Sequence, residues 1–400
     1  MKTDAVKRAL ELRKTLRKDD KVLVVDFSNT LQGKDTTKVI DLMPNVATGE
    51  YLFRAKFNIK NIDPKAALEY KVPFKDVRNM PEKEIEDFVK RQEFDFPLWF
   101  KHNEGFEMKK ITDYNTPFIV QVAGCNFHDG TETGGCWYCF VDNISNNGKP
   151  GAGKAWLGVD ELVDSMQAAR AKINDFYRNN YDYNLDIKVL RISGGEPTIV
   201  LDYALDVWRQ IAKRGLDLVG QIDSNLSTGS VVRRFEKEGI YKRHILEKLA
   251  EHPVKVLTAI KGTDPISLQD NVQSNPSMKE QLYSIKRFVN AGFDIYPQMY
   301  NPNPLTLWNY LEKMDRHIEN FALRVHIGPL KIYGPTTQRL THEANRLGIA
   351  PETLIAQKKQ EWDDNYKNGC DVINSYLQEY YGVGYKNRVR PKVPLKILKS

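Results

Sequence analysis

Apolar runs and amphipathic stretches alternate along the chain from about residue 116. The runs predict six strands, at 117–125, 187–195, 216–225, 254–262, 294–300 and 323–333. The stretches between them repeat apolar residues at helical spacing and predict intervening helices. Near-continuous apolar strands that alternate with helices favour a parallel sheet with right-handed crossovers. The pattern predicts an α/β fold, either a partial barrel or an open doubly wound sheet, with its chemistry at the carboxyl ends of the strands.

Two different regions flank this alternating core. The N-terminal part predicts a basic amphipathic helix over about the first 20 residues, strands at 22–27 and 51–61 and a short helix at 81–93, without a catalytic motif. The C-terminal part is charged and helical over 351–382, and it ends in a basic tail. We therefore expect an N-terminal accessory region (1–115), an α/β core (116–335) and a C-terminal helical extension (336–400).

The composition narrows the class of protein without naming a partner. The chain has 400 residues and a formal net charge of +7, an excess that permits an anionic or RNA substrate but does not require one. No apolar run approaches the ~20 residues that cross a bilayer, and the N-terminus lacks the apolar core of a secretion signal. These features predict a cytoplasmic protein that does not insert into membranes.

Three of the four cysteines lie in one run, CNFHDGTETGGCWYC, at residues 125–139. Clustered thiols in an intracellular chain are typical of metal ligands rather than of disulfides. Cys125, Cys136 and Cys139 suit a 4Fe–4S cluster whose fourth iron has no protein ligand. With His128 the same run reads C-x2-H-x7-C-x2-C, which also suits a closed zinc site. The run alone does not decide between these two assignments.

A second motif, RISGGEPTIV, follows the next predicted strand at residues 191–200. A glycine pair at a strand end allows the backbone to approach a ligand closely, because no Cβ intervenes. The Glu196 carboxylate would suit the amino group of an amino-acid-like ligand. Taken alone, the motif is explained equally well by an ordinary tight turn between strand and helix. Its place one strand–helix unit after the cysteines favours a site shared by both motifs.

Together the two motifs resemble those of the radical S-adenosylmethionine (radical SAM) superfamily. Members usually carry C-x3-C-x2-C after the first barrel strand and GGEP after the second, and this chain has CWYCF and SGGEPTI in the same order. The first gap between cysteines is ten residues rather than three, which we interpret as an expanded loop. The resemblance covers about residues 116–335 and implies a partial (βα)6 TIM-like barrel.

The resemblance also implies how the motif residues act. The three cysteines of the run would bind three irons, and S-adenosylmethionine (SAM) would chelate the fourth. Gly194, Gly195 and Glu196 would hold the methionine amino group, and Tyr138 would contact the adenine. The reduced cluster would cleave SAM to methionine and a 5′-deoxyadenosyl radical that abstracts hydrogen from the substrate. The same resemblance implies an electron donor such as ferredoxin or flavodoxin, and sensitivity to oxygen.

Further candidate residues lie at later strand ends. Ser224 and Asn225 match positions where family members carry polar residues near the cofactor, although turn formation explains them equally well. Lys261 matches the lysine in the D-x-K element of glycyl-radical activases, but Ala259 stands at the aspartate position and weakens an activase assignment. The candidates for the substrate pocket are Tyr296, Gln298, Tyr300 and His326.

These motifs do not specify the substrate, because substrate residues vary freely around a shared cofactor site. A peptide or protein, an RNA and a small molecule are all candidates. The one cysteine outside the run, Cys370, is too few for an auxiliary cluster. The alternative from another class is a zinc-stabilised module that binds RNA or protein through the Cys/His loop and the basic tail. That alternative leaves SGGEP without a role, so we expect the radical SAM enzyme.

Overall fold

The fold is described from a computed structural model. The residues that the structure describes are 4–25, 42–45, 50–53, 118–131, 134–181, 184, 186–385 and 393–398. Within the N-terminal part, β3 (Leu42–Asn45) pairs with β4 (Glu50–Phe53) in antiparallel fashion. The rest of the strand predicted at 51–61, and the whole helix predicted at 81–93, lie outside the described residues.

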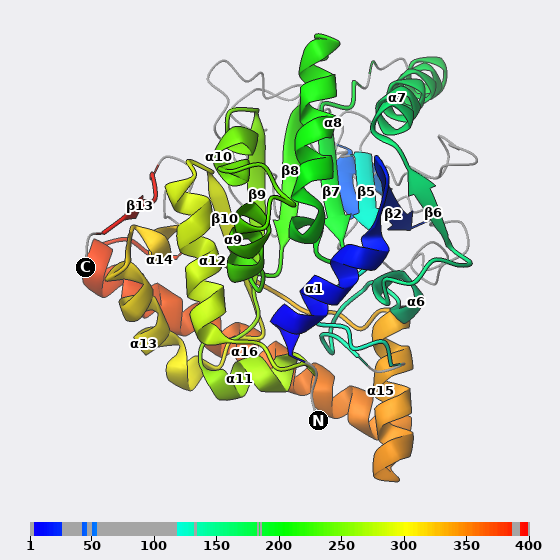
Figure 1. Ribbon diagram of the computed structural model, residues 1–400. Helices are drawn as coiled ribbons and strands as arrows, with labels where there is room; N and C mark the ends of the chain where they lie inside the picture. The colour runs from blue at the N-terminus through cyan, green and yellow to red at the C-terminus, as the bar shows by residue number, and fades with distance from the viewer. Residues whose placement is uncertain are drawn as a thin grey trace.

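A sheet with six neighbouring parallel strands forms the centre of the fold (Figure 1). These strands are β5 (Phe118–Val122), β7 (Val189–Gly194), β8 (Val219–Ser224), β9 (Val254–Ile260), β10 (Ile295–Tyr300) and β12 (His326–Gly328). They lie side by side in the order in which they occur along the chain. The predicted mixed α/β fold with a mainly parallel sheet is therefore confirmed. Among the described strands, no pairing joins one edge of this sheet to the other.

The N-terminal edge of the sheet is antiparallel. β2 (Lys21–Val25) pairs with β5 on one side and with β6 (Lys154–Leu157) on the other. The two-residue β1 (Arg17–Lys18) folds back on β2. A segment from the start of the chain is thus part of the central sheet. The predicted division at residue 115 stays a prediction.

Helices connect the parallel strands, and α8, α9, α10 and α12 lie together on one face of the sheet (Figure 1). The connecting helices are α6 (Asn143–Asn146), α7 (Val159–Tyr181), α8 (Leu201–Lys213), α9 (Gly229–Lys237), α10 (Ile245–Ala250), α11 (Pro265–Asn271), α12 (Met278–Asn290), α13 (Pro304–Asp315) and α14 (Phe321–Arg324). None of the described helices combines the length and the apolar character needed to cross a membrane.

Burial alternates along β9, as a sheet with one tightly packed face requires. Val254, Val256 and Ile260 are buried in the main hydrophobic core, whereas Lys255 and Leu257 on the other face are half-buried. The helices cover the first of these faces. The second face is the one on which polar side chains gather.

Two predicted elements differ from the structure. The helix predicted between the third and fourth strands covers about 241–250, and α9 precedes it without a predicted counterpart. The first four residues of α9, GSVV, include glycine and two β-branched valines, which are weak helix formers. The strand predicted at 323–333 is shorter, because Leu323 and Arg324 end α14. Long-range packing decides both cases, since Phe235 of α9 and Leu323 are buried.

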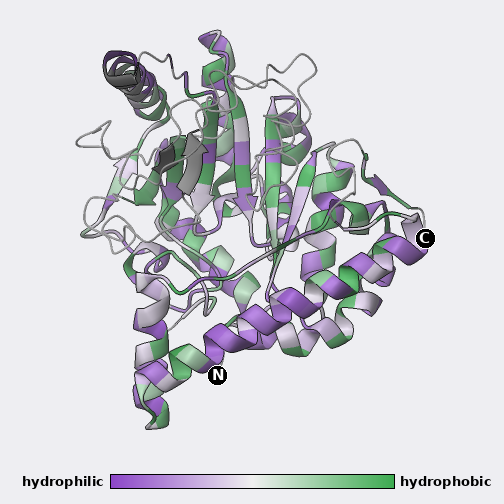
Figure 2. Ribbon diagram, turned by 180° about the vertical axis from the view of Figure 1, so that it is seen from behind, coloured by the Kyte–Doolittle hydropathy of each residue, from purple (hydrophilic) through white to green (hydrophobic). Residues whose placement is uncertain are grey.

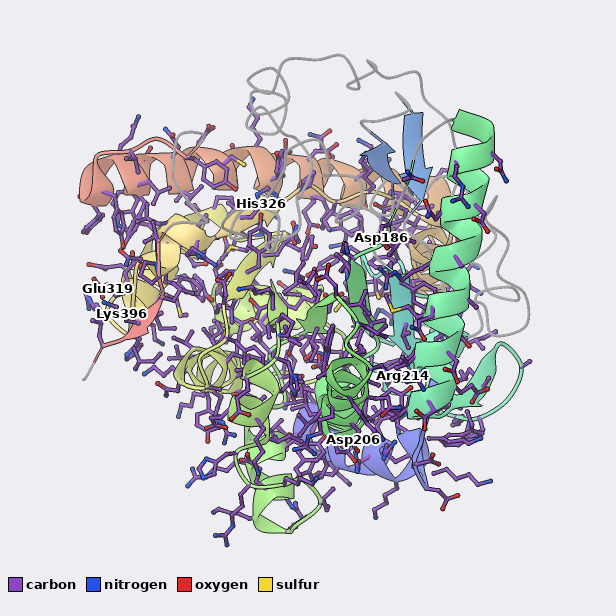
Figure 3. The ribbon with its side chains drawn as sticks, turned by 90° about the horizontal axis from the view of Figure 1, so that it is seen from above. Asp186, Asp206, Arg214, Glu319, His326 and Lys396 are labelled. Carbon is purple, nitrogen blue, oxygen red and sulfur yellow. The ribbon has the colours of Figure 1, made fainter. Side chains whose placement is uncertain are left out.

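The predicted terminal helices are present. The helix predicted near the start of the chain is α1 (Ala5–Leu16), and the one predicted at 351–382 is α16 (Pro351–Tyr381). α16 and the preceding α15 (Gly334–Leu347) run below the central sheet (Figure 1). Figure 2 shows many hydrophilic residues along α16 and hydrophobic residues in the strands. The last described strand, β13 (Lys396–Ile397), pairs with β11 (Ile318–Glu319), and Figure 3 labels the facing residues Glu319 and Lys396.

Candidate functional site

The cysteine run begins directly after β5 and folds back on itself. The Cys125 amide donates to the carbonyl of Asn146 at 3.0 Å, and the Cys139 amide donates to the carbonyl of Cys136 at 3.1 Å. Cys136 is buried, and Cys125 and Cys139 are half-buried against the same hydrophobic cluster. The second bond closes the Cys-x-x-Cys turn and places its two cysteines on one short segment. The fold therefore brings the three thiols to one end of the sheet.

The SGGEP motif lies directly against the segment that carries Cys125. The Gly195 amide donates to the Val122 carbonyl at 2.9 Å, and the Glu196 amide donates to the Gly124 carbonyl at 2.8 Å. A Cβ on Gly195 would lie 1.8 Å from the Gly124 carbonyl oxygen, and one on Gly194 would lie 1.9 Å from Gln121 Cγ. Gly194 also has a φ of +93°. These glycines are required because two backbone segments meet here, a different reason from the approach to a ligand expected from the sequence.

Glu196 is completely buried at the start of a 3-10 turn formed by Pro197–Val200. Its Oε1 accepts from Thr198 Oγ1 at 2.5 Å, and its Oε2 accepts from the Asn225 amide at 2.7 Å. Burial raises the pKa of Glu196 to about 7, although hydrogen bonds from Thr198, Asn225 and Ser224 oppose this shift. The carboxyl group thus ties the SGGEP turn to the end of β8.

The buried carboxyl group makes stability depend on pH. Because its pKa is about 7 in the folded chain and lower in the unfolded chain, the folded chain holds the proton more tightly. The free energy of unfolding should therefore fall by about 3 kcal/mol as the pH rises from 4.5 to above 7. Glu196→Gln should remove most of this dependence in urea unfolding at pH 5 and pH 8. Exposed Glu352→Gln is the control, and an unchanged pH dependence in Glu196→Gln would refute the assignment.

Asn225 connects Glu196 to the first cysteine. Its Nδ2 donates to Asn126 Oδ1 at 2.9 Å and lies 3.7 Å from Cys125 Sγ. Asn126 in turn donates to Ser227 Oγ at 2.7 Å. Ser224 is buried, and its Oγ accepts from the Leu226 amide at 3.1 Å. The predicted residues Ser224 and Asn225 therefore lie with the two motifs, and Asn126 and Thr198 are partners that the sequence analysis missed.

Lys261 follows β9 and faces two aromatic rings. Its Nζ lies 5.0 Å from the ring centroid of Tyr138 and 5.1 Å from that of Tyr300. The two rings are 6.0 Å apart, and Trp362 of α16 packs edge-on against Tyr138, also at 6.0 Å. Tyr138 is buried, and its hydroxyl has no hydrogen-bond partner within the described part of the chain. Lys261, Tyr138 and Tyr300 thus form an aromatic and cationic wall beside the cysteines.

The thiols influence each other electrostatically. Burial raises the pKa of Cys125 well above its usual range, and the neighbouring Cys136 and Cys139 raise it further. Burial also raises the pKa of Cys136 to about 11, while the positive charges of Lys261 and Arg339 lower it. The side-chain amides near two of the sulfurs suit an iron–sulfur centre, in which the thiols would bind as thiolates. Within the described ranges, however, no set of three or more His, Cys, Asp and Glu side chains is arranged to hold a metal ion.

His128 is buried inside the cysteine loop. Its Nδ1 accepts from the Gly130 amide at 3.0 Å, which leaves only the other ring nitrogen for a metal. Burial lowers the pKa of His128 to about 4, and the nearby Arg339 lowers it further. The neutral ring can thus serve the loop as a hydrogen-bond acceptor without any metal.

The four candidate pocket residues do not all lie together. Tyr300 belongs to the wall beside the cysteines, whereas Tyr296 is buried near Val189 at the opposite end of the strands. Gln298 is buried, and it pairs in register with His326. His326 begins β12, which packs against α16 (Figure 3). Of these residues, Tyr300 is the one that the described contacts place at the candidate site.

A polar network on β7 and β8 was missed by the sequence analysis. Arg191 donates to Asp223 Oδ2 through Nε at 2.8 Å and through Nη2 at 2.6 Å. Ser193 donates to the same oxygen at 2.5 Å, and Gln221 donates to Oδ1 at 2.6 Å. Polar and apolar residues alternate in RIS (191–193) and in QID (221–223). This alternation is the sequence signal for the network, because it places the polar side chains on one face of the sheet. This face is the one opposite the helices.

Comparisons with known proteins add little to this description. No protein-family profile and no curated protein matches the chain. Among solved structures, it is similar to the cobalamin-dependent S-adenosylmethionine radical enzyme OxsB with aqua-cobalamin bound, at 8% identity and a TM-score of 0.40. That match covers 64% of this chain and 40% of OxsB, so the chain spans less than half of that protein. A mutant spore photoproduct lyase with bound AdoMet and dinucleoside spore photoproduct matches at 8% identity and a TM-score of 0.36, over 75% of this chain and 92% of the lyase. Likenesses of this size assign neither a family nor a function to the chain.

Proposed function

We propose that the chain is a radical SAM enzyme. The observation that carries the proposal is the pair of backbone hydrogen bonds by which the SGGEP turn holds the segment leading into Cys125. Two motifs that lie about 70 residues apart are thereby parts of one structural site, as a shared cofactor requires. The six parallel strands in chain order favour a partial (βα)6 barrel with this site at the carboxyl ends of its strands.

In this proposal Cys125, Cys136 and Cys139 hold a 4Fe–4S cluster. Such a cluster, when reduced, supplies the electron that cleaves SAM into methionine and a 5′-deoxyadenosyl radical. The protein binds and orients SAM near the cluster. Tyr138 would offer an aromatic surface for the adenine, and Gly194, Gly195 and Glu196 would hold the methionine amino group.

The other residues of the site orient these groups and exclude water. Asn225 and Asn146 each place an amide 3.7 Å from a cysteine sulfur, where it can donate a weak hydrogen bond to a thiolate. Trp362 covers Tyr138 from the side of α16. Enclosure of this kind protects a reactive radical from side reactions with solvent.

The positive charge of Lys261 should support the chemistry without holding the metal. Lys261→Met preserves the length of the side chain and removes the charge that lies beside Cys136 and the two rings. Loss of this charge should cost about 1.4 kcal/mol of transition-state stabilisation, which would slow SAM cleavage about tenfold. The iron content should be unchanged. Exposed Lys237→Met should cleave SAM at the normal rate. A normal rate in Lys261→Met would show that this charge has no part in the reaction.

Substrate and partners belong to the same proposal. We expect a cytoplasmic, oxygen-sensitive enzyme that takes its electron from a donor such as ferredoxin or flavodoxin. The substrate is a peptide or protein, an RNA or a small molecule. The activase assignment is weaker, because Ala259 cannot replace a carboxylate.

One experiment separates the enzyme from the zinc-stabilised binding module. Protein purified without oxygen is reconstituted with iron and sulfide, reduced with dithionite and mixed with SAM. We expect a brown protein with about four irons per chain that releases 5′-deoxyadenosine. A colourless protein that holds one zinc ion and releases no nucleoside would establish the zinc module instead.

A further inference from the structure

Two arginines, one from each terminal part of the chain, hold the cysteine loop. Arg8 of α1 donates to the His128 carbonyl at 3.2 Å and to the Asn147 carbonyl at 2.9 Å. Arg339 of α15 donates to the carbonyls of Cys139 and Val141, and at 3.0 Å to Asn143 Oδ1. The first arginine holds the start of the loop and the segment after it, whereas the second holds its end.

Arg339 reaches the cysteines through both backbone and side chains. It bonds the carbonyl of Cys139 directly. It also holds Asn143, the first residue of α6, and Asn146 of the same helix contacts Cys139 Sγ and the Cys125 amide. A ring contact between Phe140 and Tyr333, at 6.3 Å, fixes the start of α15 to the same loop. Movement of Arg339 would therefore affect two of the three cysteines.

The buried side chain of Arg339 is committed to the cysteine loop. It is completely buried, and within the described part of the chain none of the ion pairs includes it. Its hydrogen bonds go instead to the backbone of Cys139 and Val141 and to the side chain of Asn143. Breaking these bonds would leave buried N–H groups without partners, so the guanidinium and its positive charge stay beside Cys139.

We propose that Arg339 is a positioning residue that fixes the second half of the cysteine loop and places a positive charge beside it. The benefit to a bound cluster rests on the proposed function, whereas the order of the loop does not. A cation near an iron–sulfur cluster stabilises the reduced form, which carries one more negative charge. Arg8 holds the start of the loop in the same way, through its hydrogen bonds to backbone carbonyls.

Thiol alkylation of the iron-free, reduced full chain tests the mechanical part. N-ethylmaleimide labelling of each cysteine is followed by mass spectrometry, with Cys370 of α16 as the internal reference. Arg339→Gln should raise the labelling rate of Cys139 relative to Cys370 by about fivefold or more. Arg346→Gln is the matched control, because Arg346 lies on the same helix, is exposed and pairs with Glu343 of that helix. A rate for Cys139 within about twofold of the native rate would overturn the proposal.

A second variant keeps the test decisive if Arg339→Gln does not fold, which faster labelling of Cys370 would reveal. Arg8→Gln removes a half-buried side chain and should raise the relative labelling rate of Cys125, with Lys7→Gln as its control. Arg339→Lys keeps the charge but cannot reproduce the three contacts, so the relative rate at Cys139 should still rise. If the relative labelling rate of Cys125 stays at the native value in Arg8→Gln and that of Cys139 does so in Arg339→Lys, the arginines do not order the loop.

The reduction potential of the reconstituted cluster tests the effect of the positive charge of Arg339. Arg339→Gln should shift the midpoint potential to more negative values, and Arg339→Lys should restore it towards the native value. An equal shift in both variants would refute the electrostatic role. If the native chain binds no cluster, the proposed function fails, while the alkylation result still decides whether the arginines order the loop.

Discussion

A chain that carries Cys136→Ala is expected to bind no stable 4Fe–4S cluster and to release no 5′-deoxyadenosine above background. Cys136 is the most deeply buried of the three cysteines, and it lies in the turn that also presents Cys139. Two thiols cannot hold a cluster that needs three protein ligands. Iron content, visible absorption and 5′-deoxyadenosine release after anaerobic reconstitution measure the effect.

Cys370→Ala is the matched control for this loss. Cys370 lies in α16, outside the cysteine run, and is half-buried. Its removal should leave iron content and nucleoside release at native levels. Full iron and full activity in Cys136→Ala would contradict the cluster assignment.

Gly195→Ala should have the second largest effect, on both folding and cluster binding. The added Cβ would lie 1.8 Å from the carbonyl oxygen and 2.1 Å from the carbonyl carbon of Gly124. Neither atom belongs to a flexible side chain, so the backbone itself must move. We expect a loss of about 3 kcal/mol or more in the free energy of unfolding, measured by urea denaturation. The displaced Cys125 segment should also lower the iron content.

Gly158→Ala separates this clash from the general effect of replacing glycine. The nearest atom to a Cβ at Gly158 is 3.7 Å away, which is an ordinary contact. This variant should therefore unfold within about 1 kcal/mol of the native chain. If the two variants were equally stable, the close approach of SGGEP to the Cys125 segment would be wrong.

The strands were predictable because their signal is local. β5 is a nearly continuous apolar run, β7, β9 and β10 are rich in apolar residues, and the order of these strands in the sheet follows from short helical connections. The predicted length of β12 was too great, because the apolar residues before this strand form the end of α14. Apolar character alone does not separate a buried strand from a buried helical turn.

The motif residues of the site were predictable, but the distant residues that pack against them and hydrogen-bond to them were not. Successive strand ends lie at one edge of a parallel sheet, so Cys125 and Glu196 were expected to be neighbours. Arg339 and Trp362 lie more than 190 residues after the first motif, and no local pattern indicates that they pack there. The close approach of the glycine pair to the segment before Cys125 was not predictable, because a sequence does not show which backbone will lie against it.

The hydrogen bond between Arg339 and Asn143 has a consequence for the order of events during protein synthesis. The two residues are 196 positions apart, so at about 5–20 residues per second the ribosome needs about 10–40 s to make the intervening chain. During that interval the cysteine loop exists without the helix that holds its end. The delivery of iron and sulfide should therefore be productive only after α15 has left the ribosome. A nascent chain stopped before Gly334 should take up metal poorly, even though every cysteine of the run has already been translated.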